Sequence, residues 1–236
     1  LGRVVGEAMG WRMTFAGIGG CALLVMAALA WLLPALPSRN TGSLSSLPLL
    51  ARRPALMLLY ALLIVVISAQ FAGYTYLEPL VQRLGGFQGQ VTTLALLLNG
   101  AAGIVGSLLY ARLGPGHPRG FLVLAIAGMA ACLLALVPAL ASVWSLYALV
   151  SLWGMAMIAF ALDMQAKVLH LASDATDVAM SLFSALFNIG IGAGALIGSQ
   201  VAVHAGMQHI GLAGGVLAAI GCVLALTMVW RYAAAL

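Results

Sequence analysis

The chain has 236 residues, of which 64% are hydrophobic and 6% are charged, and its formal net charge is +5. Soluble domains usually carry about 25% charged residues, so this composition excludes an ordinary soluble domain and indicates a protein that is partly dissolved in lipid. The positive residues are spread over short segments between apolar runs, which favours a role in membrane orientation over the binding of nucleic acid.

Apolar runs follow one another along the chain, and each is predicted to be a membrane-spanning helix. Backbone groups in lipid must form their hydrogen bonds within their own segment, and a helix satisfies this requirement. The expected fold class is therefore an all-α membrane protein. The predicted spans cover residues 13–33, 54–80, 91–113, 121–140, 143–168, 178–203 and 210–230.

The polar segments between these runs predict loops and helix starts. Two prolines end the first run, and the Ser-rich residues 38–51 are predicted to form a loop. Pro54 lies in the first turn of the second helix, where its missing N–H is not needed. Residues 173–177 contain Asp and Thr side chains that can cap the sixth helix. The first residues, LGRVVGEAMGWR, do not form a signal peptide, so we expect the sequence to be part of a longer protein.

The positive residues predict an orientation, because loops on the cytoplasmic side carry more Lys and Arg. If residues 38–53 are cytoplasmic, then Arg3, Arg12 and Arg83 are the positive residues on the other side. The C-terminus is then cytoplasmic as well. The cytoplasmic set would be Arg39, Arg52, Arg53, Arg112, Arg119, Lys167 and Arg231.

An internal repeat relates the second, third and fourth predicted helices to the last three. A shift of 92 residues lays residues 100–107, GAAGIVGS, over residues 192–199, GAGALIGS. Each unit contains three spans, so the second unit is inverted in the membrane relative to the first. Inverted three-helix repeats are typical of secondary transporters.

Polar side chains concentrate on the second and fifth predicted helices, which occupy equivalent places in the two repeats. Ionisable groups inside spans usually face a bundle interior or a water-filled path, so we expect these helices to line a polar cavity. Amides and phenols suit a polyhydroxylated ligand, although hydrogen bonding between helices explains the same residues. The predicted substrate-binding residues are Gln70, Tyr74, Tyr76, Glu78, Gln165, Asn99 and Asn188.

Two acidic side chains within or near the predicted spans have alternative interpretations. Glu78 precedes Pro79, which is expected to break the helix near its outer end. A buried Glu78 would be suited to proton coupling, whereas an exposed one would be a charged helix end in water. Asp163 and Lys167 are four residues apart on one helix face, which predicts a structural ion pair.

The run FNIGIGAGALIGSQ at residues 187–200 matches the glycine pattern of a dinucleotide-binding loop. Such a loop needs a preceding strand and an acidic residue about 20 positions later, and the sequence has no Asp or Glu after Asp177. The glycines instead predict close helix packing, with the other half of a larger protein as the expected partner. The predicted packing glycines are Gly100, Gly103, Gly106, Gly190, Gly194 and Gly198.

Cofactor chemistry is not expected. Cys21, Cys132 and Cys222 lie in separate apolar runs, and His204 and His209 have no acid or Cys nearby, so neither a metal nor a disulfide is predicted. The sequence contains no nucleotide loop of the Walker type and no Ser-His-Asp arrangement, so we do not expect an enzyme.

Four stretches carry a family resemblance: LGRVVGEAMGWRMTF, SLPLLARRPALM, YTYLEP and DATDVAMSLFSALFNIGIGAGALIGSQV. They resemble sugar efflux transporters of the SotB type, in the drug:proton antiporter group of the major facilitator superfamily. The resemblance implies that residues 1–36 are the end of helix five and helix six of an N-terminal half. Residues 37–53 would be the central cytoplasmic loop and residues 54–236 the C-terminal six-helix domain.

The resemblance also implies a function. Family members are proton-driven exporters of arabinose-like sugars and thiogalactosides that work by alternating access in the bacterial inner membrane. The implied partners are the lipid bilayer, a sugar, protons and the N-terminal half of the same transporter. Alternatives are the export of drugs, nucleosides or amino acids, or a truncated membrane product that does not transport. Ala111 stands where the superfamily's gating motif has an acid, so a charge-based latch is not expected there.

Overall fold

The structure is a computed structural model that describes residues 10–32 and 46–233. Within these residues the secondary structure is helical, with no strand. The chain divides into two compact units, Leu1–Asn40 and Thr41–Leu236. The predictions about Arg3, Arg39 and the start of the central loop concern residues outside the described ranges.

The first unit contains the helix α2, Trp11–Leu32. Its 22 residues correspond to a length of about 33 Å, enough to cross the ~30 Å hydrocarbon core of a bilayer. The predicted helix over residues 13–33 is therefore confirmed up to residue 32.

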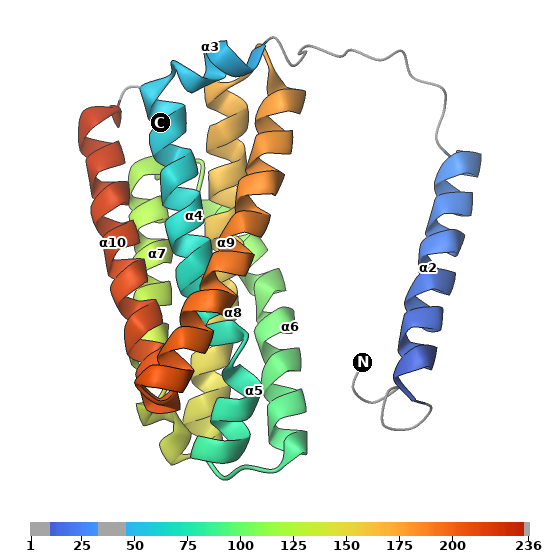
Figure 1. The fold of residues 1–236 in the computed structure, drawn as a ribbon. Helices are drawn as coiled ribbons and strands as arrows, with labels where there is room; N and C mark the ends of the chain where they lie inside the picture. The colour runs from blue at the N-terminus through green and yellow to red at the C-terminus, as the bar shows by residue number, and fades with distance from the viewer. Residues whose placement is uncertain (1–9, 33–45, 234–236) are drawn as a thin grey trace. The chain divides into compact units, whose positions relative to one another are not determined.

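The second unit is a bundle of long helices whose axes are roughly aligned, with the chain running both up and down the bundle (Figure 1). Among the described residues of the whole chain, six helices are long and apolar enough to cross a membrane, which confirms an all-helical protein of membrane type. The long helices of the bundle are α4 (Pro54–Tyr74), α6 (Gly89–Leu113), α7 (Pro118–Leu134), α8 (Val143–Leu171), α9 (Thr176–His204) and α10 (Ile210–Arg231).

The helix α7 is shorter than predicted. The sequence suggested a span over residues 121–140, but α7 ends at Leu134 and a 3-10 helix, η3 (Pro138–Ala141), follows. Pro138 explains this end, because it has no N–H for the Leu134 carbonyl and its ring would collide with that group. The 17 residues of α7 span about 26 Å, less than a typical bilayer core.

The second predicted helix is interrupted before Pro79. α4 ends at Tyr74, a turn follows, and the chain continues through α5 (Leu77–Pro79) and the π-helical segment η2 (Leu80–Leu84). The interruption begins four residues before the proline because Pro79 cannot donate to the Thr75 carbonyl. The predicted break is confirmed, although the helical segment extends beyond the predicted end at residue 80.

The predicted loop over residues 38–51 is wrong at its end. Residues 47–51 form the short helix α3, Leu47–Ala51, which has a proline in its first turn and places Leu50 in the core. The serines before residue 47 favoured a loop in the prediction, although the apolar residues 47–51 form a helical turn.

The contacts between helices have the same pattern when the triplets α4–α6–α7 and α8–α9–α10 are interchanged, with α4 corresponding to α8, α6 to α9 and α7 to α10. α4 packs on α9 as α8 packs on α6, α10 packs on α4 as α7 packs on α8, and α7 packs on α10. Arg53 at the start of α4 donates a hydrogen bond to the Leu171 carbonyl at the end of α8. The first helices of the two triplets therefore run in opposite directions. The packing therefore has the pattern expected of two inverted three-helix repeats.

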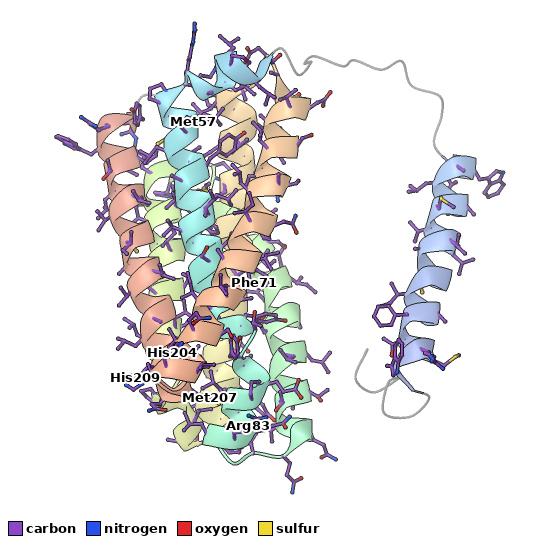
Figure 2. The ribbon with its side chains drawn as sticks, in the orientation of Figure 1. Met57, Phe71, Arg83, His204, Met207 and His209 are labelled. Atoms are coloured by element: carbon purple, nitrogen blue, oxygen red, sulfur yellow. The ribbon has the colours of Figure 1, made fainter. Side chains whose placement is uncertain are left out.

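The bundle carries its positive residues mostly at one end. A hydrogen bond from Arg119 to the Ala233 carbonyl joins the start of α7 to the segment after α10. Arg83, His204, Met207 and His209 lie near the other end (Figure 2). The arginines at the first end are Arg52, Arg53, Arg112, Arg119 and Arg231.

Candidate functional site

Gln70 on α4 and Trp153 on α8 form a buried polar contact between the two helices. The indole N–H of Trp153 donates to the Gln70 side-chain oxygen at 2.5 Å, and both residues are buried. Tyr74 packs edge-on against the same indole, with ring centroids 6.2 Å apart, and against Phe71. Of the predicted substrate-binding residues, the structure thus brings Gln70 and Tyr74 together around one tryptophan.

Tyr76 and Glu78 lie beyond this cluster, after the interruption of α4. The Tyr76 hydroxyl donates to the Ala195 carbonyl of α9 at 3.3 Å, so this phenol takes part in helix packing. Glu78 is exposed and accepts a hydrogen bond from Gln82 at 3.0 Å. The structure therefore shows Glu78 as a charged helix end, and the buried setting considered for proton coupling is absent from the described bundle.

Asn99 joins α6 to α8. It is buried, and its side-chain N–H donates to the Val150 carbonyl at 2.8 Å. The Asn99 backbone also lies against Gly154, where a Cβ would collide with the Asn99 carbonyl. Asn99 thus stabilises the parallel contact of α6 and α8, and its hydrogen bond involves neither Gln70 nor Tyr74.

Asn188 and Gln165 lie away from the Gln70 cluster. Asn188 is exposed on α9 and donates to the Ser184 carbonyl one turn earlier in the same helix. Gln165 is half-buried on α8, two residues after Asp163. The seven predicted binding residues therefore do not converge on one site in the described bundle.

The glycines of α9 pack against α4, which corrects the predicted partner of this stripe. A Cβ on Gly194 would lie 2.5 Å from the Ser68 carbonyl oxygen, and one on Gly198 would lie 2.7 Å from the Ala72 carbonyl oxygen. The expected partner was a separate half of the protein. The glycine face is covered by α4, so this contact lies within the domain.

The equivalent glycines of α6 differ from those of α9, because two of them pack on a neighbouring helix and one does not. Gly103 contacts Ile158, and Gly106 contacts the Met155 backbone, so both pack on α8. Gly100 is exposed, and no atom of another described helix lies within 4 Å of its Cβ position. Gly100 therefore has no packing partner among the described helices, and its predicted contact with the other half of a larger protein stays a prediction.

Asp163 and Lys167 form an ion pair inside α8. Their side chains are 2% and 6% exposed, and the ammonium nitrogen lies 2.6 Å from Asp163 Oδ1. The second carboxylate oxygen, Oδ2, is buried and has no hydrogen-bond partner among the described residues. The predicted pair is confirmed, but its unpaired oxygen was not foreseen.

An apolar cavity of about 430 Å³ opens between α3, α4 and α9. None of its lining residues belongs to the predicted substrate-binding set. Figure 2 shows Met57, one of its residues, near the start of α4, with Phe71 farther along the same helix. The cavity is lined by Leu47, Ala51, Met57, Tyr60, Ala61, Ile64, Leu182 and Leu186.

A two-pronged contact ties the start of α4 to the turn between α8 and α9. The Arg53 guanidinium contacts both carboxylate oxygens of Asp174 at 2.7 and 2.6 Å and donates to the Leu171 carbonyl at 2.8 Å. These hydrogen bonds, together with the Arg53 charge, hold the pKa of Asp174 below its usual range. Such bidentate contacts are stronger than ordinary hydrogen bonds, although exposure to water weakens this one.

Trp153 is the main site residue that sequence reasoning missed. It lies in the middle of an apolar run, where an indole N–H requires a partner, so a search for a matching acceptor could have suggested Gln70. Among the described residues, no group of three or more His, Cys, Asp or Glu could hold a metal ion. No protein-family model matches the chain.

Proposed function

We propose that the chain is part of a membrane transporter that exports sugars in exchange for protons by alternating access. The observation that carries this proposal is the packing of the triplets α4–α6–α7 and α8–α9–α10 as inverted equivalents. In secondary transporters such repeats form the domains that rock about a central binding site. The residues Gln70, Tyr74 and Trp153 lie where the first helices of the two triplets meet.

The outward face of α9 supports a second helical half as the partner of this bundle. Ser181, Ser184, Asn188 and Gly192 succeed one another at helical spacing and are exposed. Exposed bulky apolar side chains occur on both α9 and α10, for example Leu196 and Val223, but α9 carries this small and polar stripe in addition. Small and polar residues favour helix–helix contact in lipid, so we propose that α9 faces the N-terminal half of the transporter.

The distribution of charge supports the orientation proposed for the bundle. Arginines gather at the end that contains α3 and the end of α10, whereas Arg83 lies at the other. By the rule that positive loops remain inside, the C-terminus is cytoplasmic in the bacterial inner membrane.

Transport in vesicles tests the proposal. The chain, alone and with any coding sequence that its gene carries upstream, is reconstituted into proteoliposomes with an imposed pH gradient. We expect radiolabelled arabinose or a thiogalactoside to move against the direction of the protons, and dissipation of the gradient to stop accumulation. Sugar movement that is independent of the gradient would contradict proton coupling, and its absence in both forms would contradict sugar export.

The apolar cavity favours one alternative cargo. Its lining residues, among them Met57 and Ile64, offer mainly hydrocarbon surface, which suits an apolar drug better than a sugar. The same vesicles loaded with a fluorescent lipophilic cation distinguish the two, because an Ile64→Asn change should impair drug export but leave sugar export intact.

A further inference from the structure

We propose that Asp163 and Lys167 form a proton-binding site within the membrane domain, in which the proton binds Asp163 Oδ2 and releases Lys167. This inference deepens the proposed proton-coupled export, on which its physiological purpose rests. It assigns the coupling role to α8 instead of Glu78, which is exposed.

The first argument is the cost of the pair. Burying two charges requires their desolvation, and replacing such a pair with apolar residues is often neutral or stabilising. Asp163 and Lys167 are nearly inaccessible on a helix long and apolar enough to cross a membrane. Ionisable groups in such positions usually belong to ion pathways or proton relays, so a purely structural role is a poor explanation.

The second argument is the unpaired oxygen. Among the described residues, the buried side-chain atoms without a hydrogen-bond partner are Thr92 Oγ1 and Asp163 Oδ2. An ionised carboxylate accepts several hydrogen bonds, and a dry, unused lone pair on it is costly. A proton bound at Oδ2 would remove the negative charge and therefore that cost.

The neighbouring elements supply no second cation that is shown to pair with Asp163. Tyr110 on α6 interacts electrostatically with Asp163, and the Tyr60 hydroxyl on α4 is engaged with the Ala179 carbonyl. Asp163 therefore depends on Lys167 for charge compensation within the described bundle. The titratable groups of the elements packed on α8 are Tyr110 and Arg112 on α6, Arg119 and Cys132 on α7, Tyr60 and Tyr74 on α4, and Asp177 and His204 on α9, with none in η3.

A hydronium ion gives up a proton by breaking one of its O–H bonds and is left as water, and the proton forms an O–H bond with Asp163 Oδ2. The carboxyl becomes neutral, and the hydrogen bond and ionic contact of Lys167 with Oδ1 are lost. The ammonium would then be a buried, uncompensated charge. Lys167 lies four residues closer to the end of α8, so its flexible stem can extend the charge towards water near His170. Proton binding thus moves positive charge towards that end of the bundle.

Infrared difference spectroscopy of the purified full chain tests this site directly, without any transported solute. Spectra are compared between about pH 5 and about pH 9, a range in which exposed carboxyls remain largely ionised. We expect a protonated-carboxyl band that Asp163→Asn removes and that the matched control Glu78→Gln retains. Lys167→Gln, which removes the cation, should shift the titration of this band upward by about one pH unit or more.

The outcomes separate the inference from the proposed function. A band that survives in Asp163→Asn, or the lack of any band in the wild-type chain, would overturn the proton site. Size-exclusion profile and helical circular dichroism check that the variants fold, and a misfolded Asp163→Asn is replaced by Asp163→Glu, which should retain the band at a shifted frequency.

In the export assay, Asp163→Asn should abolish acceleration by a pH gradient but preserve sugar counterflow without one. Gradient-driven export in that variant would overturn the site and leave the proposed export standing, whereas failure of sugar to move in the wild-type chain would leave the infrared result intact.

Discussion

The helix α9 has two faces with small residues, and they have different surroundings. The inner stripe, Gly190, Gly194 and Gly198, is buried against α4, where added side-chain atoms would meet backbone. The outer stripe, Ser181, Ser184, Asn188 and Gly192, is exposed. Small residues permit close approach in both places, but the inner stripe maintains one domain, whereas the outer stripe is available to another.

A glycine pattern therefore does not by itself identify the helix that packs against it. The inner stripe is the more regular of the two and is the one that sequence reasoning assigned to a separate half of the protein. The outer stripe is irregular and partly polar, so its sequence pattern is a weaker signal of helix packing. Substitutions on the two stripes should therefore affect different properties of the protein.

Gly194→Leu should have the largest effect. The new side chain would collide with the Ser68 carbonyl and the start of the next turn of α4, and a rigid backbone cannot move aside cheaply. We expect a loss of about 3 kcal/mol or more in the free energy of unfolding, or failure to fold. Equilibrium unfolding in mixed micelles measures this loss. The matched control is Gly192→Leu on the same helix, which should remain within about 0.5 kcal/mol of the wild type.

Gln70→Leu should have the next largest effect, because it breaks another inward contact. The Trp153 N–H would remain buried without its acceptor, which costs about 1–3 kcal/mol. The same unfolding measurement applies, and tryptophan fluorescence should also change. Combining Gln70→Leu with Trp153→Phe removes both partners, so the double variant should be more stable than the sum of the two losses predicts. Strict additivity would argue against this hydrogen bond.

Asp174→Asn should have a smaller, pH-dependent effect at the turn that precedes α9. The pKa of Asp174 is lowered in the folded protein, so its contribution to stability is present above the unfolded value, about 3.9. That contribution is lost as the pH falls through the lower, folded pKa. The wild type should therefore melt slightly above the variant at neutral pH, and the two should converge in acid. A difference that persists in strong acid would contradict this account.

Asn188→Leu should leave the stability of the bundle nearly unchanged, within about 0.5 kcal/mol. The Asn188 amide bonds within its own helix and faces outward, so its loss disturbs no contact between described helices. If the outer stripe faces a second half, the variant should nevertheless reduce transport. A marked loss of stability would show instead that this face already packs within the domain.

The sequence predicted the helices well because their signal is local. Long apolar runs that cannot satisfy their backbone in any other way must be helical, and Pro54 and Pro79 mark a start and an interruption. The predicted end of α7 at residue 140 was wrong because Pro138 ends the helix one turn earlier, at Leu134. The contact of Asp163 with Lys167 was also predictable, since both lie one helical turn apart.

The predicted binding residues were less successful as a group. Polarity identified Gln70, Tyr74, Asn99 and Asn188, but it did not indicate the direction in which each side chain points. That direction depends on the rotation of each helix about its axis, which is set by its neighbours. Trp153 was missed for the same reason, because its role exists only where α8 meets α4.

The sequence by itself therefore determined that this protein is helical and suited to lipid, and its 92-residue repeat predicted two related triplets of helices. These properties follow from composition, spacing and repeats, which act within single segments. The tertiary structure decided that the inner glycines of α9 are covered by α4, that Gln70 contacts Trp153, and that one oxygen of Asp163 is left unpaired. The physical reason is that burial and pairing depend on which helix faces come together, and long-range packing selects those faces.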